Sequence, residues 1–445
     1  MNISLLQICL ALILSIAGII LLTRYLNLHA FFSLLIASTA FGLMVGKPFL
    51  ETLNSMQNGF GSLLQQIGLL VAVGSCLGMM MEKTGAMEVI GNRIIQFFGI
   101  RYSVLAMTTI GIIVGIPVFC DSGFIILSRL ISSIASQSTA NSAQLSLALS
   151  SGLYTTHVLV PPTPGPLAAA ANLNFSEHIS TLILISLIAS IPVALVSYFF
   201  SLRLGRSIKA DQIIIELKNE HTEISAWKSF LPLILPILLI ASASIPSIIS
   251  LNENIISLLR IIGHPVVALM IGLLLSTMSI KKKDTKEMPF WISTALKDAG
   301  IILLITGAGG AFGAVIKTSG IDILLKEYVS NSSSQGIIFM IIAFVIAAIL
   351  KTAQGSSTSS IIITSSLLAP LAATAGFVSP AQLSVLVIAI GGGAMTVSHA
   401  NDSYFWVVSQ FGGISPRDAF RSFTLLTLAQ GITALITSIL LFQFV

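Results

Sequence analysis

The chain has 445 residues, of which 55% are apolar and 9% are charged, whereas an average soluble domain carries about 25% charged residues. The net charge of +5 arises from 22 basic and 17 acidic residues, and most of the basic ones lie in short segments between apolar runs. These values exclude a soluble enzyme, a disordered chain and a nucleic-acid-binding protein. They predict an all-α, polytopic protein embedded in the lipid bilayer.

Apolar runs of spanning or nearly spanning length recur along the whole chain. A helix needs about 20 residues to cross the hydrocarbon core. The first run has that length and lacks a basic leader, so we expect a retained span rather than a signal peptide. Several later runs are shorter and stop at polar, glycine-rich or proline-rich stretches, a pattern typical of discontinuous helices and re-entrant hairpins. The runs are 3–23, 31–45, 62–81, 103–118, 179–202, 230–249, 265–280, 301–316, 336–350, 383–395 and 423–445.

Two segments between the runs are rich in charge, 203–228 and 281–297. Two apolar runs lie between them, so both segments fall on the same side of the membrane. The intervening segment, 250–263, has a single cation, Arg260. Because cytoplasmic loops carry an excess of Lys and Arg, we expect the two charged segments to be cytoplasmic.

The chain also contains an internal repeat. The glycine motif 74–78 recurs 235 positions later as 309–313, and the interrupted stretch 117–123 falls opposite 352–358 at the same offset. A third pair, at a slightly larger offset, would give His157 and His399 corresponding places. Matching interruptions in two halves indicate a transporter whose site lies where the interruptions meet. We therefore predict a first transmembrane repeat at 1–205, a cytoplasmic charged linker at 206–228 and a second transmembrane repeat at 229–445.

The interruption at 117–124 contains Asp121 in apolar surroundings. A charge at mid-membrane costs at least about 2.5–3.5 kcal/mol, so this carboxylate needs a partner, a cavity or a proton. Either Asp121 caps a helix that begins at Ser122 or Gly123, or it titrates and contacts a substrate.

The second motif, 157–166, follows His157 with four prolines in six residues. Prolines remove backbone donors and break helices, so we expect an unwound crossing that includes Pro162, Thr163 and Gly165. An exposed loop is the alternative, but the segment has no charge and lies between apolar pieces.

The third motif runs from Lys351 to Ser360 and contains Gln354, Gly355 and then five successive hydroxyl residues. Hydroxyls and backbone amides at a helix start can bind an anion, and they also hydrogen-bond sugar hydroxyls. Small polar residues that only pack helices together are the alternative.

The fourth motif follows the glycines 391–393. It places His399, Asn401, Asp402 and Ser403 within five residues, between apolar runs. It offers an imidazole, an amide, a carboxylate and a hydroxyl. A structural polar cluster is the alternative interpretation.

Segments 160–166, 353–356 and 398–406 resemble the signature segments of the gluconate permease (gluconate:proton symporter) family, which also includes transporters of other sugar acids and of D-serine. This resemblance implies a bacterial inner-membrane secondary transporter. It further implies two inverted repeats, discontinuous helices, re-entrant hairpins, a scaffold with a mobile, elevator-type transport domain, and a homodimer. His399, Asn401 and the triplet 164–166 resemble the sugar-acid branch. Many members have His where this chain has Thr163, and Glu where it has Asp121. These differences imply a substrate that is a sugar acid related to gluconate.

We therefore expect proton-coupled uptake of gluconate or a related sugar acid. No arginine lies in the four motifs and Lys351 stands at their edge, so helix N-termini and hydroxyls should hold the substrate carboxylate. Burial raises the pKa of a carboxylate, so Asp121 or Asp402 is expected to carry the proton. The candidate substrate-binding residues are Ser122, Gly123, His157, Pro162, Thr163, Gly165, Gln354, Gly355, Ser356, Ser357, Thr358, His399, Asn401 and Ser403.

Three alternatives remain open at this point. One is a permease for D-serine or another small carboxylate, and another is a channel. The third is an intramembrane serine hydrolase with His157 or His399 as base, although the chain has no Gly-x-Ser-x-Gly elbow.

The proton is the expected coupling ion, and no cofactor or metal is expected. Cys9, Cys76 and Cys120 lie in apolar runs without metal-like spacing, so we expect buried small side chains and no disulfide.

Overall fold

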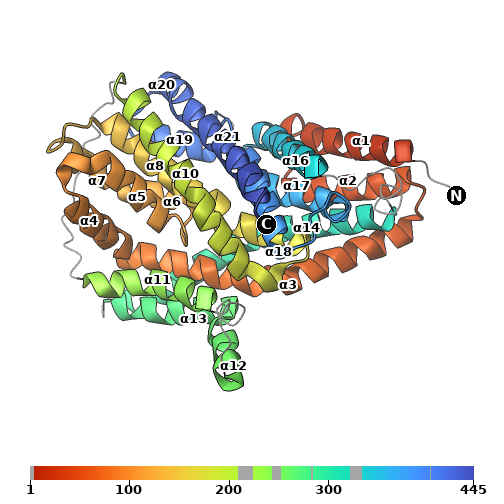
Figure 1. The fold of residues 1–445 in the computed structure, drawn as a ribbon, viewed down its shortest axis with the longest axis horizontal. Helices are drawn as coiled ribbons and strands as arrows, with labels where there is room; N and C mark the ends of the chain where they lie inside the picture. The colour runs from red at the N-terminus through yellow and green to blue at the C-terminus, as the bar shows by residue number, and fades with distance from the viewer. Residues whose placement is uncertain (1–4, 209–223, 243–251, 282–283, 321–332, 401) are drawn as a thin grey trace.

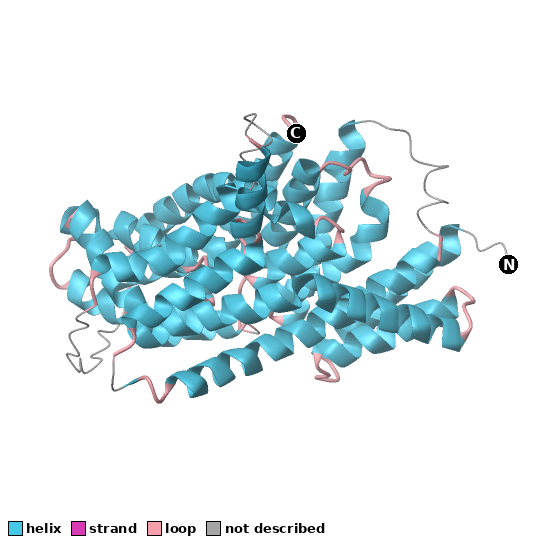
Figure 2. Ribbon diagram, turned by 90° about the horizontal axis from the view of Figure 1, so that it is seen from below, coloured by secondary structure: helices cyan, strands magenta, loops and turns pink. Residues whose placement is uncertain are grey.

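The computed structural model describes residues 5–208, 224–242, 252–281, 284–320, 333–400 and 402–445, and within these ranges helices are the only regular secondary structure. The fold class predicted from composition is therefore confirmed. Long helices pack side by side along the longest axis of the molecule (Figures 1 and 2). The helices up to residue 205 are α1 Leu5–Arg24, α2 Ala30–Met44, α3 Phe49–Thr84, α4 Ala86–Phe98, α5 Ser103–Val114, α6 Cys120–Leu127, α7 Arg129–Ala135, α8 Ser142–Leu159, α9 Pro164–Asn172 and α10 Ile179–Gly205.

The second half of the chain forms a similar succession of long and short helices. They are α11 Ala226–Ser242, α12 Glu253–Ile262, α13 Pro265–Ser276, α14 Met288–Thr318, α16 Ser333–Gln354, α17 Ser357–Ala372, α18 Pro380–Met395, α19 Ser403–Phe411, α20 Pro416–Arg421 and α21 Phe423–Phe442.

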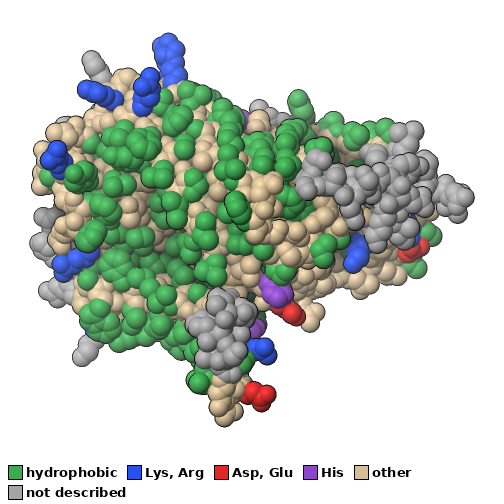
Figure 3. Space-filling model, in the orientation of Figure 1, with side chains coloured by type: hydrophobic (Ala, Val, Ile, Leu, Met, Phe, Trp, Pro, Cys, Tyr) green, Lys and Arg blue, Asp and Glu red, His purple; other side chains and the backbone are tan. Residues whose placement is uncertain are grey.

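Five helices in the described ranges are long and apolar enough to cross a membrane, and the number rises to seven if each of two bent helix pairs is one span. One bent pair is α4 with the segment Ile100–Val114, at 108°, and the other is α12 with Pro265–Ser279, at 61°. The face seen in Figure 3 is mostly apolar, with Lys and Arg gathered mainly near its edges. Both features agree with a multi-pass protein that contains broken helices.

Corresponding helices of the two halves have corresponding neighbours. The long helices α3 and α14 pack along each other, while α2 packs on α14 and α13 packs on α3. In the first half α8 lies between α5 and α10, and in the second half α18 lies between α16 and α21. This repetition agrees with the internal repeat seen in the sequence. Because α10 ends at Gly205 and α11 begins at Ala226, the last three residues of the predicted linker are helical.

Three predicted boundaries were wrong. The run 62–81 is the second part of a 36-residue helix, α3. Lys297, expected in a charged loop, lies inside α14. The segment expected to be a loop at 250–263 contains α12, whose exposed apolar side chains Ile255, Leu258 and Ile261 lie at helical spacing. Residues 243–251, where the run 230–249 was expected to end, lie outside the described residues.

The apolar runs also missed α8, which is buried along nearly its whole length. The hydropathy pattern missed this helix because many of its side chains are polar. The hydroxyls of Ser146, Ser151 and Thr155 each donate to the carbonyl four residues earlier in the same helix, at 2.7–2.8 Å. Hydroxyl side chains that bond their own helix backbone can therefore enter a buried helix without leaving an unpaired donor.

Candidate functional site

Four short helices begin at the breaks in the two halves. Phe119 precedes α6, Thr163 precedes α9, Ser356 caps α17, and Asp402 caps α19. Helix α6 packs on α19, and α9 packs on α17, so each pair joins one helix from each half. The N-terminus of a helix carries a partial positive charge and unsatisfied N–H groups. Bringing several of these ends together favours an anion.

The repeated glycines let the broken segments approach the long helices. A Cβ at Gly78 of α3 would lie 2.5 Å from the carbonyl oxygen of Pro117, and Gly74 faces Pro162. At the corresponding place in α14, a Cβ at Gly313 would lie 2.9 Å from the carbonyl oxygen of Ser366 in α17. The repeated glycines thus mark close crossings of the long helices, by the α5–α6 break in the first half and by the middle of α17 in the second.

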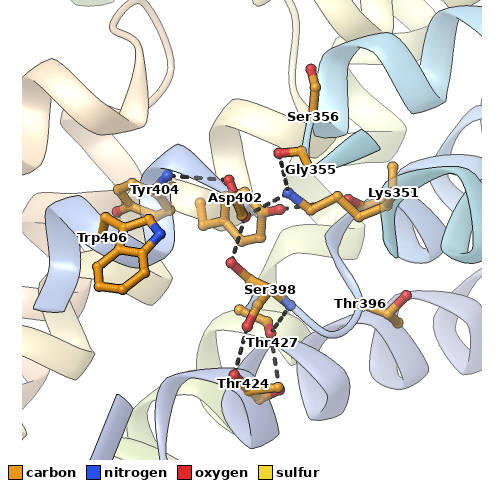
Figure 4. A network of polar contacts seen from close by, with 12 residues as sticks. Lys351, Gly355, Ser356, Thr396, Ser398, Asp402, Tyr404, Trp406, Thr424 and Thr427 are labelled. Carbon is orange, nitrogen blue, oxygen red and sulfur yellow. Dashed lines mark hydrogen bonds and ion pairs between the residues drawn. The ribbon is translucent and has the colours of Figure 1, made fainter. Parts of the chain in front are cut away.

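A buried ion pair joins the breaks of the second half (Figure 4). The Nζ of Lys351, in the last turn of α16, lies 2.5 Å from Oδ2 of Asp402, and the two side chains are 1% and 5% exposed. The same ammonium donates to the carbonyl oxygen of Gly355 at 3.1 Å and lies 5.8 Å from the centre of the Tyr154 ring. Gly355 has a φ of +76°, a conformation that glycine adopts readily.

Asp402 also holds the start of α19. Its Oδ1 accepts from the N–H of Tyr404 at 3.1 Å, and its Oδ2 accepts from the hydroxyl of Ser398. The backbone of Ser398 is fixed in turn by α21, since its N–H donates to Thr427 at 3.0 Å and its carbonyl accepts from Thr424 at 2.6 Å (Figure 4). One carboxylate therefore connects the α16–α17 break, the α18–α19 link and α21.

Beside this network lie buried polar atoms that have no hydrogen-bond partner among the described residues. They are Oδ1 of Asp121, Nδ1 of His157, Oγ of Ser75, and both amide atoms of Gln354. Asp121 and His157 both interact electrostatically with Lys351 and Asp402. Since buried polar atoms in proteins are nearly always paired, such a group of unpaired atoms fits a polar ligand that binds between them.

A small cavity lies beside two of these groups, Ser75 and His157. Ser75, Phe119, His157, Pro162 and Thr163 are among the residues that line it, and its volume is about 10 Å³. That is roughly the space one water needs. This conformation therefore leaves room for no more than about one water beside Ser75 and His157.

Two of the larger cavities lie near the ends of the broken helices. One, of about 510 Å³, is lined by Gln66, Asn172 and Lys317, among others, near the carboxyl ends of α9 and α17. The other, of about 630 Å³, is an apolar groove along α16 that includes His399.

Most of the predicted site residues lie at or next to the breaks. Asp121, Ser122 and Gly123 form the first turn of α6, His157 lies in the last turn of α8, and Ser356 caps α17 through a bond from the N–H of Ser359 at 3.2 Å. The others that lie at the breaks are Pro162, Thr163, Gly165, Gln354, Gly355, Ser357, Thr358 and Asp402.

Some predictions about these motifs were wrong. Helix α6 begins at Cys120, so Asp121 lies inside the first turn and does not cap a helix that begins at Ser122 or Gly123. His157 and His399 do not correspond, because His157 belongs to α8 whereas His399 lies four residues beyond the end of α18. The binding roles of Ser403 and Asn401 stay predictions: Ser403 is exposed at the start of α19, and Asn401 lies outside the described residues.

The sequence interpretation left Lys351 at the edge of the site, whereas the structure places it at the centre. A lysine that directly follows an apolar run was the available signal, since a cation at membrane depth requires a partner. Ser75 and Tyr154 were also missed, and both lie on helices that pass the breaks.

Cys76 and Cys120 are buried and free, as predicted, while the side chain of Cys9 is outside the description. The described residues contain no group of three or more metal-binding side chains.

Comparison with known proteins adds independent information. The model of the GntP family permeases matches residues 6–445. The inner membrane permease YgbN of Escherichia coli K12 is 30% identical, over 94% of this chain and 95% of its own length. A gluconate permease of Pseudomonas aeruginosa is 29% identical, over 97% and 96% of the two chains. The D-serine transporter DsdX of E. coli K12 is also 29% identical, over 97% of each chain. Among solved structures, the YdaH transporter of Alcanivorax borkumensis covers 89% of this chain and 87% of its own, with 15% identity and a TM-score of 0.49.

Proposed function

The chain belongs to the GntP family of permeases, and from this premise we propose that it carries gluconate or a related sugar acid, together with a proton, across the bacterial inner membrane. The members of this family are transporters and not enzymes, which removes the intramembrane hydrolase from consideration. The observation that carries the proposal is a buried cation, Lys351, set among helix N-termini and unpaired polar side chains.

The chemistry of the site matches a polyhydroxylated carboxylate. Lys351 and the converging helix N-termini favour the carboxylate group. The amide of Gln354, the Nδ1 of His157 and the hydroxyl of Ser75 supply donors and acceptors for hydroxyl groups. A site built to bond hydroxyls discriminates strongly against molecules that lack them, because its buried groups would then stay unpaired.

A permease for D-serine or another small amino acid is the second candidate. The family includes the D-serine transporter DsdX, which is as similar to this chain as the gluconate permease of P. aeruginosa. One observation at the site favours it: the unpaired Oδ1 of Asp121 could accept a hydrogen bond from an ammonium group. Asp402, by contrast, is already paired with Lys351.

Transport requires the central cavity to open. A sugar acid has many times the volume of the single water for which the cavity has room, so the described conformation corresponds to a closed state. We propose that the helices carrying the breaks move relative to the rest of the protein in an elevator-type cycle, and that the protein works as a homodimer. Seating the carboxylate near Lys351 would then accompany closure of the site.

The test is transport into proteoliposomes that contain the purified protein, with a pH gradient, acidic outside. We expect labelled gluconate or a related aldonate to accumulate above its external concentration, which would also exclude a channel. In a competition panel, sugar acids and keto-sugar acids should inhibit uptake, and D-serine should have little or no effect. Strong competition by D-serine with no effect of any sugar acid would instead support the second candidate.

A further inference from the structure

We propose that the Lys351–Asp402 pair is an exchange switch, in which a proton taken up by Asp402 releases the ammonium of Lys351 to the carboxylate of the substrate. The inference rests on the proposed function for the identity of the anion. It adds the residue that binds the carboxylate, the residue that takes the proton, and the reason why one requires the other.

The surroundings of Lys351 allow such an exchange. Its ammonium group has three directions occupied, by Oδ2 of Asp402, by the carbonyl of Gly355 and by the face of the Tyr154 ring. The carbonyl and the ring are parts of the fold and stay in place. The carboxylate of Asp402 is the one partner whose charge a proton can remove, and a substrate carboxylate has the same chemistry and can take that position.

Asp402 can also accept a proton without losing its structural role. In the neutral form, Oδ1 can still accept from the N–H of Tyr404 and keep α19 capped. The proton on Oδ2 can be donated to the hydroxyl oxygen of Ser398, which now donates to that same atom. Ser398 is held on both sides by Thr424 and Thr427, so the acceptor is already positioned.

The charge balance explains why proton and anion would cross together. In the empty site the ammonium and the carboxylate cancel. With a proton alone the pair carries a net positive charge, and with the anion alone it carries a net negative charge. With both bound, the protonated Asp402 is neutral and Lys351 is paired with the substrate, so the charges cancel again. Because an uncompensated charge at membrane depth is costly, the empty and doubly loaded sites are the states that can cross.

The pair is enclosed by groups from several elements. Asp121 is the second carboxylate that faces it, and this makes Asp121 the competing candidate for the proton. The charge balance holds when Asp121 is neutral, because a fixed negative charge there would leave the state with a proton alone as the neutral one. The titratable groups that face the pair are Cys120 and Asp121 from α6, Tyr154 and His157 from α8, and Tyr404 from α19.

The decisive variant is Asp402→Asn, which imitates the protonated carboxyl group at nearly the same size. Reconstituted in vesicles, it should retain part of its sugar-acid exchange but lose accumulation driven by a pH gradient. In the wild type, the apparent affinity for the anion should fall as the pH rises, by up to about tenfold per pH unit, since one proton is linked to binding. In Asp402→Asn this dependence should be absent.

Matched variants separate the switch from general effects of charge removal. Lys351→Gln should abolish binding, both alone and combined with Asp402→Asn. The double variant leaves no unpaired carboxylate buried, so its loss of binding cannot come from such a charge. Lys47 and Glu51 form an exposed ion pair at 2.6 Å, and Lys47→Gln combined with Glu51→Gln should leave the pH dependence of uptake unchanged. Asp121→Asn removes a candidate substrate contact, so its uptake can be slower, but the pH dependence of its apparent affinity should persist.

A measurement on the wild type keeps the inference testable if Asp402→Asn does not fold. Uptake of a monovalent sugar acid should be electroneutral, so a membrane potential imposed with potassium and valinomycin should not change its rate. A substrate-dependent current would overturn the switch. So would gradient-driven accumulation by Asp402→Asn, or loss of the pH dependence of the apparent affinity in Asp121→Asn. If the wild type moves no sugar acid at all, the proposed function fails instead, and the two failures are distinguishable.

Discussion

The two halves of the molecule build similar sets of broken helices but place different chemistry in them. At the offset of the glycine repeat, 235 positions, Ile116 in the first half corresponds to Lys351 in the second. The residues that precede the short helices α9 and α19 also correspond, and they are Thr163 and Asp402. An apolar side chain and a hydroxyl therefore stand where the other half has a buried ion pair.

This difference indicates a division of roles between the halves. The second half contains the pair whose charge a proton can change, Lys351 and Asp402. The first half contributes unpaired polar atoms on Ser75, Asp121 and His157, and the second half adds the amide of Gln354. We infer that the first half mainly recognises the body of the substrate, and that the second half couples its carboxylate to the proton. Because the two halves share an architecture but differ at their breaks, one site can both recognise the substrate and couple it to a proton.

The largest expected difference between the halves is in stability. Asp402→Ala leaves Lys351 buried without its counter-ion, and breaking a buried pair in this way costs about 3–5 kcal/mol. At the corresponding position, Thr163→Ala removes one hydrogen bond, from its hydroxyl to the carbonyl of Val160 at 2.6 Å, which is worth about 0.5–1.5 kcal/mol. Thermal unfolding of both variants in the same detergent measures the difference. Equal shifts would show that the two breaks are energetically equivalent.

A smaller effect is expected at the two glycines where another segment closely crosses a long helix. Gly78→Ala would place a Cβ 2.5 Å from the carbonyl of Pro117, and Gly313→Ala would place one 2.9 Å from the carbonyl of Ser366. We expect both to lower the free energy of unfolding by about 1–3 kcal/mol, with Gly78→Ala the more severe.

Gly68 of α3 is the control for these two variants, since a Cβ there would meet nothing within 4 Å. Gly68→Ala should be neutral or slightly stabilising, because alanine favours a helix. A variant at Gly78 as stable as the one at Gly68 would mean that the crossing can relax, and that the repeated glycines are not required for it.

The smallest effect concerns the two histidines. His157 is 6% exposed, lines the central cavity and has an unpaired Nδ1, whereas His399 lines the apolar groove along α16. Loss of one hydrogen bond to a neutral substrate group, about 0.5–1.5 kcal/mol, should raise the half-saturating concentration about two- to tenfold in His157→Ala. His399→Ala should change it less than about twofold, since that side chain lies in a different cavity. Initial uptake rates over a range of substrate concentrations give both values, and the reverse order would restore His399 to the binding site.

Several properties follow from residues that are close together in the sequence. The apolar fraction predicted a polytopic helical protein, and the prolines at 161–166 and the glycine at 355 predicted the breaks, because these residues restrict or free the backbone locally. The cap at Ser356 was also predictable, since a hydroxyl beside the first turn satisfies a free N–H. In contrast, α8 was missed because its buried faces are rich in serine and threonine, which hydropathy counts as polar.

The central contact was decided by the tertiary structure. Lys351 and Asp402 are 51 positions apart, and neither the apolar pattern nor the motif around each residue indicates that they meet. Their pairing depends on how α16, α18 and α21 pack, because these helices bring the α16–α17 break to the start of α19. The sequence by itself therefore determined where helices break, since that is a property of a few neighbouring residues. Packing between distant helices determined which side chains the breaks bring together.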